Sequence, residues 1–201
     1  ADENNCTAQG SGTLTVYQLP EVTVNDAHRC YSGDPVNIAA TIVSDEAGDH
    51  DYLWTVPTGE SDPGNVADFD ASEEGNYSVV VTNTETGCSS ESASGELTIT
   101  VDPTVSVDSL SRCVNGDEVT VEAIAGPAGG TFSYSWVVPD GVTDPGDVAS
   151  FTATEAGEYT VTVSDESNCT AAATGILTVY QLPEVTVNDA LRCGAGDPAT
   201  I

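Results

Sequence analysis

The stretch LTVYQLPEVTVNDA occupies Leu14–Ala27 and recurs without a single change at Leu177–Ala190, 163 positions further along the chain. Self-similarity at a fixed separation is the sequence signature of a repeat architecture. Within the stretch, Leu-Thr-Val alternates apolar and polar residues as a half-buried strand does, and Gln-Leu-Pro then interrupts the pattern. The stretch therefore predicts tandem β-structured units rather than one continuous domain.

Further landmarks recur at a shorter period, close to half of that separation. The motif Arg-Cys-x-x-Gly-Asp begins at Arg29 and returns at Arg112 and Arg192. Other features repeat in the same order along the chain: Trp54 and Trp136, Asp62 and Asp144 of two Asp-Pro-Gly turns, Tyr77 and Tyr159, and Cys6, Cys88 and Cys169. The structural period is thus either one domain of about 82 residues or a pair of alternating domains, 163 residues long.

The phase of the repeats predicts the domain boundaries. Positions 1–18 match the end of a repeat, and positions 180–201 match the beginning of one. We therefore expect two complete repeats, at 19–101 and 102–179, flanked by the last strands of a preceding repeat and the first strands of a following one. The chain is read as a window from a longer polypeptide.

Each repeat is predicted to be all-β. Apolar residues alternate at period two in several short runs, and turn residues such as Gly33-Asp34-Pro35 and Asp140-Gly141 separate the runs. About seven short strands in roughly 80 residues, with one Trp on the third and Gly-x-Tyr at the sixth, are typical of an immunoglobulin-like sandwich. The fold class is therefore an extended array of tandem immunoglobulin-like β-sandwiches.

The charge of the chain excludes whole classes of partner. Three arginines, no lysine and 33 acids give a formal net charge of -30. Such a polyanion repels nucleic-acid phosphates and anionic lipid heads, so we expect no nucleic-acid partner, and this window contains no apolar run for membrane insertion. A folded, acidic, lysine-free chain also suggests a salty environment that screens its self-repulsion.

The repeat pattern resembles a known class of surface protein. Cys-x-x-Gly-Asp-x-Val, Tyr-x-Trp, Ala-Gly-x-Tyr-Thr-Val-Thr-Val and Asn-Cys-Thr are similar to motifs in the tandem Ig-like or PKD-like repeats of giant Bacteroidota cell-surface adhesins, including gliding-motility adhesins. The resemblance covers essentially the whole chain. It implies an exported, filamentous, extracellular protein of the cell surface, secreted by the type IX pathway.

The six cysteines all occupy repeated positions, which predicts a disulfide framework and an oxidising compartment. In an Ig-like topology Cys30 lies at the bottom of its domain and Cys88 at the top, about 25 Å apart, whereas a disulfide needs Cα atoms within about 7 Å. The favoured prediction is an inter-domain bond, Cys30–Cys169, with Cys6, Cys88, Cys113 and Cys193 paired outside the window. The alternative is bonding within each domain, Cys30–Cys88 and Cys113–Cys169.

Two further sets of residues are candidate sites. Arg29, Arg112 and Arg192 are expected to form salt bridges with carboxylates at the domain junctions, where a bidentate contact would add orientation. The acidic loop containing Asp45, Glu46, Asp49 and Asp51 offers enough oxygen ligands for a weak Ca²⁺ site. A solvated acidic loop is the favoured interpretation, because the matching loop of the second repeat, Ala125–Gly130, contains no acid.

Catalysis has little chemical support in the sequence. The two histidines, His28 and His50, are interpreted as surface residues, and no nucleophile or phosphate-binding motif is present. We therefore predict a non-catalytic protein without a cofactor: a disulfide-stapled structural and adhesive region of an extracellular fibre, whose partners are neighbouring repeats or other fibre chains. The alternatives are a repeat array that binds carbohydrate or Ca²⁺, and a self-assembling filament subunit completed by strand exchange.

Overall fold

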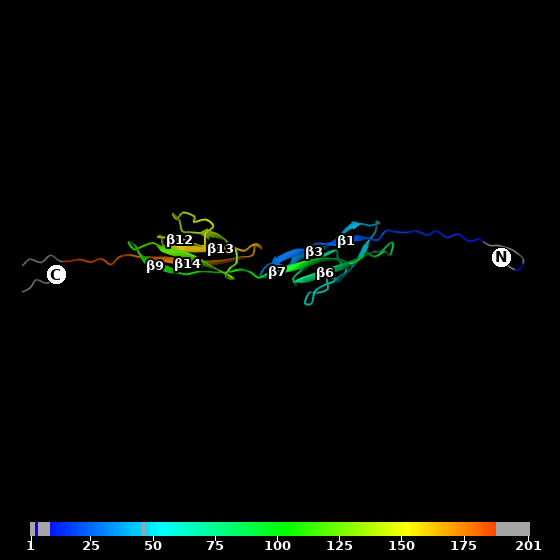
Figure 1. Ribbon diagram of the computed structural model, residues 1–201, viewed down its shortest axis with the longest axis horizontal. Helices are drawn as coiled ribbons and strands as arrows, with labels where there is room; N and C mark the ends of the chain where they lie inside the picture. Colours follow the sequence, from blue (N-terminus) through cyan, green and yellow to red (C-terminus); the bar gives the residue numbers. More distant parts are fainter. Residues whose placement is uncertain (1–2, 4–8, 46, 188–201) are drawn as a thin grey trace, which may run out of the picture. The chain divides into compact units, whose positions relative to one another are not determined.

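The computed structural model describes residues 3, 9–45 and 47–187, and the chain divides into two compact units, 1–101 and 102–201. Every regular element within the described residues is a β-strand, and Figure 1 labels several strands of each unit. No described residue belongs to a helix that is long and apolar enough to cross a membrane. The all-β prediction is confirmed.

The first unit is a two-sheet sandwich. Its first sheet has the order β1-β3-β5, and its second sheet has the order β2-β7-β6-β4. The strands are β1 (Glu21–Val24), β2 (Ala27–Cys30), β3 (Val36–Ser44), β4 (His50–Thr55), β5 (Asp68–Ala71), β6 (Gly75–Asn83) and β7 (Ala93–Thr100). All neighbouring strands are antiparallel except β2 and β7, which are the first and last strands of the second sheet in chain order and lie side by side in it.

The second unit repeats this topology strand for strand. Its sheets have the orders β12-β10-β8 and β11-β13-β14-β9, and β9 runs parallel to β14. The strands are β8 (Thr104–Val107), β9 (Leu110–Cys113), β10 (Val119–Gly126), β11 (Ser133–Val137), β12 (Ser150–Ala153), β13 (Gly157–Ser164) and β14 (Thr170–Tyr180). The shared strand order confirms the immunoglobulin-like sandwich predicted for each repeat.

Alternating side chains from both sheets fill the core of each unit. In the first unit Ile38 and Ala71 of one sheet meet Trp54, Tyr77 and Leu97 of the other, and all five are buried. The aromatic rings pack edge to face: the ring centroids of Trp54 and Phe69 lie 5.1 Å apart, and those of Trp136 and Phe151 lie 5.0 Å apart. Because every second residue of a strand faces the same side, the period-two pattern of the sequence maps directly onto this core.

A buried tyrosine near the start of the sixth strand anchors the chain in both units. The hydroxyl of Tyr77 donates to the carbonyl oxygen of Glu73 at 2.6 Å, and the hydroxyl of Tyr159 donates to that of Glu155 at 2.8 Å. This bond from tyrosine back to a nearby carbonyl is the tyrosine corner of Ig-like domains. It ties the loop before β6 to Tyr77 and the loop before β13 to Tyr159.

Candidate functional site: cysteines and arginines at the ends of the sandwiches

Each unit carries one cysteine at either end of its second sheet. Cys30 is the last residue of β2 and lies beside Thr100, the last residue of β7, whereas Cys88 precedes the start of β7 at Ala93. Because β7 is a full-length strand of the sheet, its two ends are separated by about 26 Å at roughly 3.3 Å per residue. This is far beyond the reach of a disulfide.

The second unit has the same arrangement. Cys113 ends β9 and lies beside Tyr180 at the far end of β14, whereas Cys169 immediately precedes Thr170 at its beginning. The two within-domain bonds kept as an alternative above, Cys30–Cys88 and Cys113–Cys169, therefore do not fit the topology of either unit.

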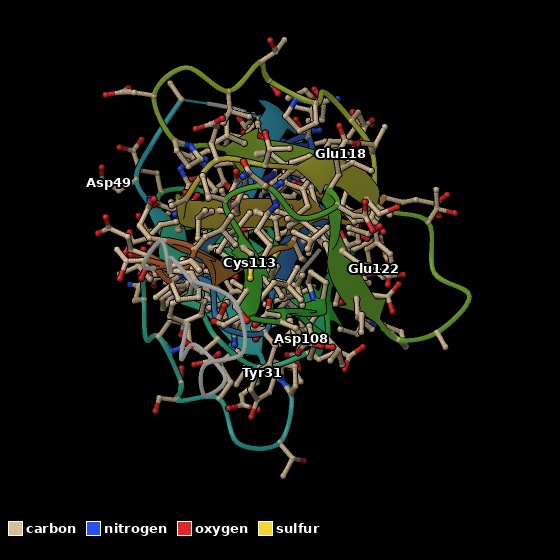
Figure 2. The ribbon with its side chains drawn as sticks, turned by 90° about the vertical axis from the view of Figure 1, so that its left-hand side faces the viewer. Tyr31, Asp49, Asp108, Cys113, Glu118 and Glu122 are labelled. Atoms are coloured by element: carbon tan, nitrogen blue, oxygen red, sulfur yellow. The ribbon has the colours of Figure 1, made fainter. Side chains whose placement is uncertain are left out.

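Each unit contains one disulfide-bonded cysteine and one free cysteine among the described residues. Cys30 and Cys169 are each disulfide-bonded, whereas Cys88 and Cys113 are free thiols. Cys169 is fully buried, Cys88 is half-buried and Cys113 is exposed, with its side chain labelled in Figure 2. Cys6 and Cys193 lie outside the described residues. Each within-domain pair would join a bonded cysteine to a free one.

The turn before the last strand positions Cys88 and Cys169. In the second unit the carboxylate of Asp165 accepts bonds from the amides of Ser167 and Cys169, and Asn168 adopts the left-handed conformation with φ of 62°. In the first unit the Asn83 side chain accepts bonds from amides of the equivalent turn, and Gly87 has φ of 71°. Short polar side chains that bond turn amides thus place both cysteines.

The arginines beside Cys30 and Cys113 bind carbonyl oxygens instead of the carboxylates predicted above. The guanidinium of Arg29 donates to the carbonyls of Gly33 and Ser72 at 2.8 Å each, and to those of Cys30 and Tyr31 at 3.2 Å. It therefore ties the turn after β2 to the loop after β5.

Arg112 makes the equivalent connection in the second unit. Its guanidinium donates to the backbone carbonyls of Asp117, Gly116 and Thr154. All acceptors of the Arg29 and Arg112 guanidinium groups among the described residues are main-chain carbonyl oxygens, and the salt bridges at the domain junctions stay a prediction. Arg192 lies outside the described residues.

In the acidic loop of the first unit, the carboxylates of Asp45 and Asp51 accept hydrogen bonds from other side chains of the protein. Asp45, whose side chain is 4 % exposed, forms an ion-pair contact with His50 and accepts a bond from the Asn83 side chain at 3.0 Å. Asp51 accepts from the Asn65 side chain at 2.7 Å, and Asp49 is labelled in Figure 2. Among the described members of the predicted Ca²⁺ site, no three offer ligand atoms that lie within 4.8 Å of one another. Glu46 lies outside the described residues.

His50, which the sequence analysis interpreted as a surface residue, has a side chain that is only 16 % exposed and belongs to this network with Asp45. A ring nitrogen of His28 shares a hydrogen bond with the hydroxyl of Thr100 at 2.8 Å, which connects β2 to the end of β7. No motif marked these contacts, because they depend on strands that meet only in the folded unit.

One carboxylate that the sequence analysis did not single out anchors two loops. Glu60 accepts bonds from the amides of Ser72 and Glu73 and from the hydroxyl of Tyr77. Burial raises the pKa of Glu60, but the amide bonds outweigh it, so the pKa lies below its ordinary value. Burial, together with this carboxylate, raises the pKa of Tyr77. The second repeat has Val142 at the matching position, because Val142 precedes Asp144 as Glu60 precedes Asp62.

Neither tryptophan offers an exposed ring to a ligand, whereas the side chains of Tyr31 and Tyr180 are exposed. Trp54 and Trp136 are buried, and their indole nitrogens donate to the carbonyls of Val66 and Val148 inside the sandwich. Both tryptophans therefore serve the core.

Comparisons with known proteins gave structural similarities alone. No family model matches the chain, and no curated protein matches it. Extracellular domains 3–5 of Drosophila OTK give a TM-score of 0.46 with 14 % identity, over 81 % of this chain and 62 % of that one. DIP-gamma IG1+IG2 gives 0.34 with 14 % identity, over 81 % and 98 %. The N-terminal four Ig domains of Dscam1 isoform 6.9 give 0.37 with 15 % identity, over 84 % and 47 %.

The chain thus spans less than two thirds of the OTK and Dscam1 structures that it matches. The immunoglobulin-like assignment rests on the strand order, the parallel first and last strands and the tyrosine corner of each unit.

Proposed function

We propose that this chain is a structural and adhesive repeat region of an extracellular fibre at the cell surface, without catalytic activity. Positions 19–101 and 102–179 are two of its repeats, and positions 1–18 and 180–201 belong to the neighbouring ones. The resemblance to giant Bacteroidota adhesins of the gliding type supports this assignment, and export by the type IX pathway would follow from it.

The oxidation state of the four described cysteines carries the proposal. Cys30 ends β2 of the first unit and Cys169 precedes β14 of the second, and both are disulfide-bonded while Cys88 and Cys113 are free. We propose that Cys30 and Cys169 bond to each other, so that a covalent link joins consecutive repeats. Such bonds persist in oxidising compartments outside the cytosol.

The free thiols fit the same scheme. Cys113 occupies in the second unit the position that Cys30 has in the first, and Cys88 occupies the position of Cys169. In a longer array, Cys113 would bond to the next repeat and Cys88 to the preceding one. Cys6 and Cys193 would serve the outer repeats, and every junction would carry one disulfide.

The topology of each unit suits a load-bearing role. The chain enters the second sheet through β2 and leaves it through β7, and these strands run parallel. A pull on the two ends therefore loads their hydrogen bonds together instead of one after another. The same holds for β9 and β14.

Tryptic mapping under non-reducing conditions tests the disulfide. The three arginines place Cys30 with Cys88 in peptide 30–112, and Cys113 with Cys169 in peptide 113–192. An inter-domain bond joins these two peptides. We therefore expect mass spectrometry to detect them as one linked species without reductant and as two separate peptides only after reduction. Two unlinked peptides would contradict the proposal.

Variants identify which cysteines form the link. Cys30→Ser should separate the two peptides, whereas Cys88→Ser and Cys113→Ser should leave them joined. Loss of the link in Cys88→Ser would show that Cys88 takes part in the bond and would contradict the proposed Cys30–Cys169 junction. Small-angle scattering of the full chain before and after reduction then tests whether the bond restricts motion, with Cys88→Ser as the control.

A further inference from the structure

Every arginine of the chain immediately precedes a cysteine, and the chain has no lysine. The three arginines are Arg29, Arg112 and Arg192, each in the motif Arg-Cys-x-x-Gly-Asp. In a chain that carries 33 acids, an arginine at these positions alone points to a role linked to the neighbouring cysteine. Within the described residues, this role can be followed for the first two pairs, Arg29 with Cys30 and Arg112 with Cys113.

The strand places each arginine and its cysteine on opposite faces of the sheet. In β2, Ala27 packs against the core, so Arg29 lies on the same inner face and Cys30 lies on the outer one. The order is the same in β9, where Leu110 packs against the core and Cys113 is exposed. An arginine held on the inner face therefore fixes the face on which the next side chain, the cysteine, emerges.

Each cysteine also closes the tight turn that follows it. The amide of Gly33 donates to the carbonyl oxygen of Cys30, and the amide of Gly116 donates to that of Cys113, at 2.9 Å in both turns. The cysteine and the turn thus share a backbone hydrogen bond. A change in the conformation of the turn therefore moves the cysteine.

The guanidinium of Arg29 connects this turn to the other sheet of the unit. It donates to the carbonyl of Gly33 in the turn and to that of Ser72 in the loop after β5, both at 2.8 Å. The strand β5 belongs to the first sheet, whereas β2 belongs to the second. Both sheets therefore hold the turn that contains Cys30.

Arg112 forms the same connection in the second unit. It donates to the carbonyls of Gly116 and Asp117 in the turn, and to that of Thr154 after β12 at 2.9 Å. A guanidinium carries five donors in a rigid planar fork, so one side chain can hold two segments in a fixed relation. A lysine ammonium, a point charge on a flexible stem, holds such a pair of segments less rigidly.

We infer that Arg29 and Arg112 are positioning residues for Cys30 and Cys113, and that each guanidinium favours the disulfide that its cysteine forms with another repeat. This inference rests on the proposed function, which places one such bond at each junction. Oxidation takes two electrons and two protons from the two thiols, and oxidised glutathione can accept them and become two thiols. Because a turn with fewer accessible conformations loses less freedom when the bond forms, the guanidinium raises the equilibrium constant for oxidation.

The exchange equilibrium with glutathione tests this role for Cys30. The full chain is limited to the pair Cys30 and Cys169 by serine at four positions: Cys6, Cys88, Cys113 and Cys193. Alkylation and intact-mass measurement count the free thiols in buffers of defined glutathione ratio. Arg29→Gln should lower the equilibrium constant for oxidation at least about 10-fold, because it removes several charge-assisted hydrogen bonds from the turn.

The matched control is Arg112→Gln in the same background, because it breaks the same connection beside a position that no longer holds a cysteine. We expect its equilibrium constant to stay within about 2-fold of the unchanged background, as for independent sites. An equal shift in both variants would mean general destabilisation and would overturn the inference, as would no shift in Arg29→Gln. If Trp54 emission shows that Arg29→Gln unfolds the first unit, Arg29→Lys takes its place with the same expected direction.

A nitroxide label on Cys113, with all other cysteines replaced by serine, tests the second arginine without any disulfide. In the electron paramagnetic resonance spectrum, Arg112→Gln should increase the rotational freedom of the label, and Arg29→Gln should leave it unchanged. An unchanged spectrum in Arg112→Gln would overturn the positioning role. Since this spectrum needs no bond between Cys30 and Cys169, failure of the positioning role and failure of the proposed junction are distinguishable.

Discussion

At the scale of single residues, polar side chains fix the turns while apolar ones fill the core. Asp62 and Asp144 each accept a bond from the glycine amide of their own turn, at 2.9 Å, as expected for Asp-Pro-Gly turns. Arg29 and Arg112 gather carbonyl oxygens from two loops each. Since buried carbonyls need donors, a cation in these acidic repeats has a structural role at the turn beside the cysteine.

Glu60 gives the first unit a pH-dependent contribution to stability that Val142, at the matching position of the second unit, cannot make. Its folded pKa lies below the ordinary value of 4.5, so its contribution to stability is present above that pH and is lost as the pH falls through the folded pKa. We expect Glu60→Gln to destabilise the first unit at pH 7 and to differ less from the unchanged chain near pH 3.

Urea unfolding followed by Trp54 fluorescence in a Trp136→Phe background measures this effect. The second unit, with Val142 at the matching position, serves as the control and is followed through Trp136 in a separate Trp54→Phe background. A Glu60→Gln difference that stays constant from pH 7 to pH 3 would show that the ionised carboxylate is not the stabilising form.

At the scale of strands, the tightest contact described here is between the last strand of each unit and the link that joins its first two strands. The link at Asn25 passes directly over Gly95, where a side chain would overlap it, and the amide of Glu96 donates to the side chain of Asp26 at 2.9 Å. The amide of Ile176 donates to the side chain of Ser109 in the second unit in the same way. The glycine lets the last strand pair on both sides while the first strand changes sheets.

Gly95→Ala should therefore destabilise the first unit by about 1–3 kcal/mol, the usual range for overpacking. Gly12→Ala introduces the same methyl group where nothing lies within 4 Å, so it should leave both units unchanged. Thermal unfolding by circular dichroism compares them. Equal stability of the Gly95→Ala and Gly12→Ala chains would mean that the close approach at Asn25 is not a constraint.

At the scale of the whole chain, charge dominates. The net charge is -30, and the described acids lie mostly at the surface, as the outward-pointing Glu118 and Glu122 side chains in Figure 2 illustrate. Like charges on a compact unit repel one another, and dissolved salt screens them over about 10 Å at 0.1 M and about 3 Å at 1 M. High ionic strength should favour the folded units.

Raising NaCl from about 0.05 M to about 1 M should therefore raise the melting temperature of both units. CaCl2 at matched ionic strength should add little to the first unit beyond this effect, because Asp45 and Asp51 already accept bonds from protein donors. Scanning calorimetry measures both. A large calcium-specific rise that Asp49→Asn removes would instead establish a Ca²⁺ site in the acidic loop.

The sequence by itself determined the repeat, the β class and the core. Period-two alternation and turn residues are local properties, so they predicted short strands with one apolar face, and Trp54, Tyr77 and Leu97 lie on such faces in the core. They also predicted that Cys30 and Cys88 lie at opposite ends of a unit, because strand direction follows from the order of strands in a sandwich.

Only the tertiary structure decided which polar groups meet. The acceptors of Arg29, the anchoring role of Glu60 and the contact between His50 and Asp45 join residues from different strands and loops. The tertiary structure also separated the buried Leu177 from the exposed Leu14, although the sequences that follow them are identical. The identity of a residue sets what its side chain can bind, but its burial and its partners depend on which distant strands fold around it.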